Sequence, residues 1–94
     1  GLEDLLEFHK EVMISFQIMN IALLDFDKLK AREGFERRFY VNNLLDKFHQ
    51  KHFERLKALI QETFLTSSIH VELLNNLERI NYHISEICKE ILNE

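Results

Sequence analysis

The chain of 94 residues has no proline and no tryptophan, only two glycines and a single cysteine. Tight β-turns are built largely from Gly, Pro, Asn-Gly and Asp-Gly, so this sequence is poorly suited to a β-sheet. Cys88 has no second cysteine with which to form an intrachain disulfide or a zinc ribbon. No apolar run approaches the roughly 20 residues that a membrane helix needs. These deficits exclude β-rich and disulfide-stapled classes and favour a helical domain.

The net charge of −4 argues against nucleic-acid binding, which needs surplus Lys and Arg. This charge is unevenly distributed. Residues 1–27 carry a net charge of −5, residues 28–57 carry +5 and residues 58–94 carry −4. One interpretation is a basic middle helix that complements two acidic ones. The other interpretation makes Lys47, Lys51 and Arg55 a contact for anionic lipid or an acidic partner.

Apolar residues recur every seven positions in three stretches, which predicts three long helices. The first is expected over residues 2–30, with the only interior glycine, Gly34, in the following turn. The second is expected over 35–62, and the third over 68–92, capped by the Ser/Thr cluster at 66–68. The sequence therefore predicts one all-α domain over 1–94, an antiparallel up-down-up three-helix bundle.

The predicted core follows the apolar positions of each stretch. The expected core residues are Leu5, Val12, Phe16, Met19, Leu23 and Phe26 in the first helix, Leu45, Leu56 and Leu59 in the second, and Leu73, Leu77, Ile80, Ile84, Ile87 and Ile91 in the third.

The sequence contains no phosphate loop, nucleophile elbow or zinc-protease motif, and we expect no enzymatic activity. In antiparallel geometry His9, His52 and His70 fall near one end of the bundle, where imidazoles could hold a divalent metal such as zinc, nickel or iron. The alternative is that each histidine is a partly buried residue hydrogen-bonded to a neighbouring helix. A second polar layer is expected from Asn20, Asp46 and residues 81–83, with a register-fixing hydrogen-bond network as the alternative to a ligand site.

The C-terminal third carries the pattern Thr-Ser-Ser-Ile-His at 66–70, followed by Leu73-Leu74 and by Leu-Glu-Arg-Ile-Asn-x-His-Ile at 77–84. With His52-x-x-Arg55-Leu56, it resembles PhoU-like domains, most closely the cytosolic domain at the C-terminus of bacterial sodium/phosphate cotransporters. The likeness covers residues 35–91, and over 1–34 it is a match of helix pattern. It implies a three-helix bundle and a non-enzymatic regulatory domain for phosphate transport.

PhoU proteins bind metal clusters through pairs of carboxylates spaced four residues apart on two helices. The equivalent positions here are Asn42 with Asp46 and Glu78 with Tyr82. Only Asp46 and Glu78 keep a carboxylate, which is too few for a multinuclear cluster. The resemblance therefore predicts a regulatory module without the family's metal cluster.

The resemblance also implies a location on the cytoplasmic side of the cell membrane, as part of a longer membrane protein. The expected partner is the transporter's own membrane domain or another copy of this chain. A homodimer is predicted because several apolar residues fall off the main stripes and would otherwise be exposed, namely Phe8, Ile14, Ile18, Ile21 and Leu44. The alternative functions are a freestanding helical metal-binding protein and a dimerisation module.

Overall fold

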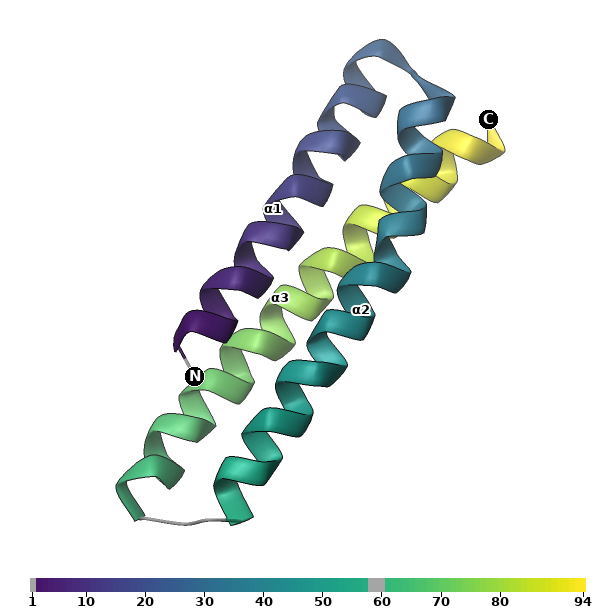
Figure 1. The fold of residues 1–94 in the computed structure, drawn as a ribbon. Coiled ribbons are helices and arrows are strands. Elements are labelled where there is room, and N and C mark those ends of the chain that lie inside the picture. The colour runs from purple at the N-terminus through teal and green to yellow at the C-terminus, as the bar shows by residue number, and fades with distance from the viewer. Residues whose placement is uncertain (1, 58–60) are drawn as a thin grey trace.

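The computed structural model confirms the helical class (Figure 1). It describes the backbone of residues 2–57 and 61–94 and the side chains of residues 3–54 and 69–94. The three helices are α1 (Leu2–Asp25), α2 (Lys28–Lys57) and α3 (Gln61–Asn93). α1 and α3 run in the same direction, α2 runs against both, and every pair of helices is in contact. The described residues contain no strand, and they form the predicted up-down-up three-helix bundle.

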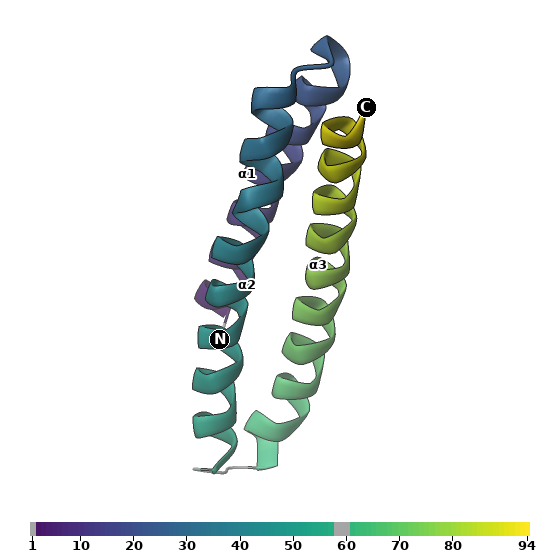
Figure 2. The same ribbon diagram turned by 90° about the vertical axis from the view of Figure 1, so that its right-hand side faces the viewer.

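The bundle is a rod of 51 × 17 × 16 Å. With a rise of 1.5 Å per residue, the 33 residues of α3 span about 50 Å, the whole length of the rod. α1 has 24 residues and is shorter. Both views show α2 and α3 extending past the N-terminal end of α1 (Figures 1 and 2).

The first turn lies at Phe26 and Asp27, and the prediction of a turn at residues 30–34 was wrong. Phe26 adopts a left-handed φ of 49°, and the Asp27 backbone N–H donates to the Ala22 carbonyl oxygen at 3.0 Å, which closes α1 in a Schellman-type ending. The Asp27 carboxylate then accepts hydrogen bonds from the backbone N–H groups of Leu29 (2.9 Å) and Lys30 (3.2 Å). Asp27 therefore caps α2, and no glycine is needed to form the turn.

Gly34 lies inside α2 and is buried. A Cβ atom at this position would stand 2.6 Å from Cys88 Sγ of α3 and 3.4 Å from Ile18 Cγ2 of α1. The glycine therefore allows the three helices to approach closely here, because a larger residue would force the Cys88 side chain to move. Burial also raises the pKa of the Cys88 thiol, because a thiolate would lose its hydration there.

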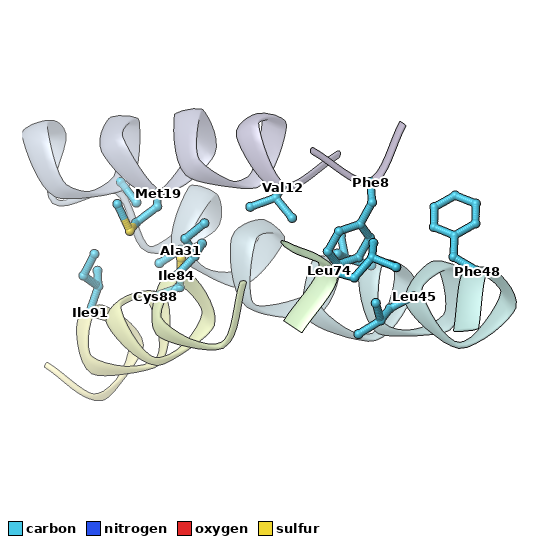
Figure 3. Close-up of a cluster of buried hydrophobic side chains, with 12 residues drawn as sticks. Phe8, Val12, Met19, Ala31, Leu45, Phe48, Leu74, Ile84, Cys88 and Ile91 are labelled. Carbon is cyan, nitrogen blue, oxygen red and sulfur yellow. The ribbon is translucent and has the colours of Figure 1, made fainter. Parts of the chain in front are cut away.

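Among the described side chains, the core forms one seam of buried residues that runs from Phe8 and Phe48 to Ile91 (Figure 3). Phe8 and Phe48 pack edge to face, with ring centroids 6.4 Å apart. The buried apolar side chains are Phe8, Val12, Met19 and Ala22 of α1, Ala31, Val41, Leu45 and Phe48 of α2, and Leu74, Ile84, Cys88 and Ile91 of α3.

The prediction of the seam was partly wrong. The buried positions among the described side chains of α3 are 74, 81, 84, 85, 88 and 91, whereas Leu73, Ile80 and Ile87 are exposed. In α1 the seam passes through Ser15 and Ala22, and Phe16 and Leu23 lie outside it, as does Phe26 in the turn. In α1 the core positions 15 and 22 are occupied by the small residues serine and alanine, which let the helix backbones approach closely. A prediction based on hydrophobicity alone therefore chose the larger neighbouring residues, Phe16 and Leu23.

The start of α3 also differs from the prediction. The helix begins at Gln61, so the Ser/Thr cluster at 66–68 lies within its backbone and does not cap it. The predicted second helix extended to residue 62, whereas α2 ends at Lys57 and residues 58–60 lie outside the described part. The predicted core positions Leu56 and Leu59 also lie outside the described side chains.

Ion pairs connect the basic middle helix to both acidic neighbours. Arg37 Nη2 lies 3.2 Å from Glu11 Oε1, and Lys51 Nζ lies 4.0 Å from Asp4 Oδ1, both between α2 and α1. Between α2 and α3, one nitrogen of the Arg38 guanidinium lies 3.8 Å from Glu86 Oε1. These contacts favour the interpretation of the charge pattern as helix complementarity. Of the stripe predicted to contact lipid, Lys47 is exposed, Lys51 makes the pair just described, and the side chain of Arg55 is not described.

Candidate interaction surface

The three histidines predicted to share a metal lie on three different helices. His9 of α1 is exposed, His52 of α2 is buried, and His70 of α3 is half-buried. Phe8, and not His9, occupies the core position at that level of α1. Among the described residues, no group of three or more His, Cys, Asp or Glu is placed to hold a metal ion. The structure therefore does not bring His9, His52 and His70 together as ligands.

The two carboxylates that match the PhoU pattern, Asp46 and Glu78, are both exposed. Glu78 lines a surface hollow of about 360 Å³ on α3. The other residues that line the hollow are Asn75, Arg79, Tyr82 and His83. All of these residues come from one helix, so the hollow does not join Glu78 to Asp46.

The predicted mid-bundle polar layer is formed only in part. Asn81 is 2% exposed, and its Nδ2 donates a hydrogen bond to Asn42 Oδ1 of α2 at 3.3 Å. Asn20 is half-buried, while Asp46, Tyr82 and His83 are at the surface. The buried bond between two asparagines has the geometry of a register-fixing contact between α2 and α3.

Arg37 organises a polar cluster that we did not predict. Its Nε donates to Ser15 Oγ at 2.8 Å, and its Nη2 donates to the backbone oxygen of Glu11 at 3.0 Å. Ser15 is 1% exposed, so its hydroxyl needs this partner. The signal was present in the sequence, because Ser15 holds a heptad position between Val12 and Met19. The cluster fastens α2 to α1 and leaves no open site.

Two apolar cavities lie between α1 and α3. One, of about 300 Å³, is lined by Leu5, Leu6, His9, Leu73 and Leu77. The other, also of about 300 Å³, lies at the end of the rod where Phe26 and Asp27 join α1 to α2, which we call the turn end. It is lined by Leu23, Phe26, Ile87, Glu90, Ile91 and Glu94. Apolar surface is therefore exposed to solvent at two places along the boundary between α1 and α3, one near each end.

Heptad spacing connects the two cavities. Residues seven apart share one side of a helix, so Met13 and Phe16 continue the side that begins at Leu6 and His9, and Ile80 lies between Leu73 and Ile87. All of these apolar side chains are exposed. We call this surface the apolar face: Leu6, Met13, Phe16 and Leu23 of α1 with Leu73, Ile80 and Ile87 of α3.

The apolar residues that the sequence predicted to be exposed are mostly not the ones that form the apolar face. Phe8 is completely buried, and Ile14, Ile18 and Leu44 are half-buried. Of the predicted surplus only Ile21 is exposed. The apolar face is instead built from five residues that the sequence had suggested for the core, together with Leu6 and Met13, which it had assigned to neither the core nor the surface.

Carboxylates line the cavity at the turn end of the apolar face, and no basic residue does. Glu90 and Glu94 line the cavity there, and Asp25 is the last residue of α1. α1 and α3 both end at this end of the rod, where the carbonyl groups of a helix C-terminus carry partial negative charge. Neither helix has a basic residue in its last turn. Lys28 and Lys30 lie on α2, where Lys30 pairs with Glu33 at 3.2 Å.

Within the described residues, no helix combines the length and the hydrophobicity that crossing a membrane would require. The chain matches no family model, no curated protein and no solved structure in the three comparisons made with known proteins.

Proposed function

We propose that this chain is a non-enzymatic interaction domain that binds a partner helix along the apolar face. The observation that carries the proposal is a set of exposed Leu, Ile, Met and Phe side chains at heptad spacing on two parallel helices, with an apolar cavity at each end. Large contiguous apolar patches on a folded protein mark sites of contact with other molecules. A groove between two helices accepts the apolar side of a third.

The resemblance to PhoU-like domains indicates the cellular process in which we propose that the domain acts. We propose a regulatory domain of a bacterial sodium-dependent phosphate transporter, located on the cytoplasmic side of the membrane and acting in phosphate uptake. Its partner is a segment of the transporter itself. A second copy of the chain, which would make a homodimer through the same face, is the competing occupant.

Phosphate uptake tests this proposal. In cells that carry the gene encoding this chain, we expect the double substitution Leu73→Asp and Ile80→Asp to alter the rate of sodium-dependent uptake of radiolabelled phosphate. Both side chains are exposed, so charges at these positions interrupt the apolar face and leave the core intact. Phe39→Asp is the matched control, because Phe39 is equally apolar and exposed but lies on α2.

Uptake that is unchanged in the double variant, at equal protein level, would contradict the transport role. Light scattering separates the two occupants. A dimer that the double substitution converts to a monomer would assign the face to a second copy, whereas a monomer before and after substitution leaves it to another partner.

A further inference from the structure

From the charge around the apolar face, we infer that its occupant is a cationic amphipathic helix: apolar side chains on one side, with Lys or Arg beside them. This inference rests on the proposed function and names the chemistry of the partner.

The first argument is the charge of the turn-end cavity. Its lining contains four apolar side chains and two carboxylates, Glu90 and Glu94, and no basic residue. Two helix C-termini add partial negative charge at the same end, and the one helix N-terminus there, that of α2, is capped by the Asp27 carboxylate. An apolar side chain that enters this cavity next to a Lys or Arg is attracted by these groups, whereas one next to Asp or Glu is repelled.

The second argument is that the basic residues of the domain are mainly on α2. Three of them, Arg37, Arg38 and Lys51, already form ion pairs with carboxylates of α1 and α3. The apolar face lies between the two helices whose segments are net acidic. Among the described residues, α1 and α3 carry only Lys10, Arg79 and Lys89 as basic residues, so most of the positive charge lies on α2.

The third argument disfavours a second copy. At the other end of the face, the first turn of α1 carries Glu3 and Asp4. Two copies packed face to face in parallel would bring Glu90 and Glu94 against the same residues of the other copy. Packed antiparallel, they would bring these carboxylates toward Glu3 and toward Asp4, whose charge Lys51 offsets in part. Both arrangements place acidic residues together, whereas a cationic helix avoids this repulsion.

The chemistry agrees with the proposed partner, because cytoplasmic segments of membrane proteins near the bilayer carry an excess of Lys and Arg. From Leu6 to Leu23 the face extends over about 26 Å, so a helix of about 18 residues covers it.

The test is calorimetric titration of the domain with two synthetic amphipathic peptides of about that length. One contains Leu and Lys, and the other contains Glu in place of every Lys. We expect the lysine peptide to bind about tenfold more tightly, and the preference to shrink when salt is raised from about 0.1 M to about 1 M. Glu90→Gln with Glu94→Gln should reduce the preference about fivefold. The matched control, Glu36→Gln with Glu54→Gln, makes the same change of net charge at exposed positions of α2 and should leave it unchanged.

A second pair of variants locates binding on the apolar face. Leu73→Ser with Ile80→Ser should weaken the lysine peptide about tenfold or more, because apolar contact is lost, whereas Phe39→Ser should not. Equal binding of both peptides, with loss in the Leu73/Ile80 variant, would overturn the cationic inference and leave the proposed function standing. A lysine preference that survives the substitution of Glu90 and Glu94 would also overturn it. Binding that the Leu73/Ile80 variant does not weaken would overturn the use of this face and with it the proposed function.

Discussion

At Gly34 a single missing side chain allows three helices to meet. A Cβ atom there would stand 2.6 Å from Cys88 Sγ, well inside van der Waals contact. A glycine inside a helix costs about 1 kcal/mol relative to alanine, so the sequence gives up helix propensity for this close approach. The sequence suggested instead that Gly34 marks a turn, because glycine serves both purposes and the contact with Cys88 is not visible in one dimension.

We expect Gly34→Ala to lower the free energy of unfolding, because overpacking of about 1–3 kcal/mol exceeds the gain in helix propensity. In a Cys88→Ala background, which removes the Sγ atom, the same substitution should raise stability by about 0.5–1 kcal/mol. Urea unfolding of the two single variants and the double variant measures this coupling. A gain in stability from Gly34→Ala in both backgrounds would refute the contact as the reason for the glycine.

The helices themselves follow from the sequence more securely than their boundaries do. Heptad spacing and the absence of turn residues were enough to predict three helices and their up-down-up order. The boundaries depend on capping chemistry that many residues can supply. Asp27 supplies it at the first turn, together with the left-handed Phe26. A phenylalanine in that conformation is uncommon, and no sequence pattern singled it out.

The cap predicts a local effect on stability. Asp27→Ala should cost about 0.5–2 kcal/mol, because two backbone N–H groups at the start of α2 lose their acceptor. Asp25→Ala is the control from the same turn. It removes a negative charge from the C-terminal end of α1 and should leave stability equal or slightly higher. Thermal unfolding followed by circular dichroism compares the two, and an equal loss in both variants would argue against a specific cap.

In the whole bundle, the core seam and the apolar face are adjacent stripes on the same helices. The sequence alone does not separate the core seam from the apolar face, because both stripes are apolar and they lie one heptad position apart. Ile80 and Asn81 show the difficulty: the isoleucine is 46% exposed and the asparagine is buried against Asn42. The sequence therefore singled out five of the seven residues of the apolar face, but not Leu6 and Met13, and their assignment to a surface required the packing of three helices.

The two stripes should respond differently to truncation. Ile84→Ala is expected to cost about 2–5 kcal/mol, because the side chain is enclosed in the seam. Ile80→Ala makes the same chemical change four residues earlier on the exposed face, and we expect a loss below about 1 kcal/mol. Chemical denaturation of both variants measures the difference. Equal losses would mean that the seam does not follow the observed register.

Because the bundle has three helices, the first helix starts toward one end of the rod and the last helix finishes toward the other. Residues 2 and 93, the outer ends of α1 and α3, point to opposite ends, and the shorter α1 sets their axial separation (Figure 1). Its 24 residues correspond to about 36 Å. Anything joined at the start of the chain is therefore held about that far from anything joined at its end. The length of α1 thus sets the spacing between the two ends of the chain, and a helix bound along the apolar face, as proposed above, would lie parallel to the direction of that spacing.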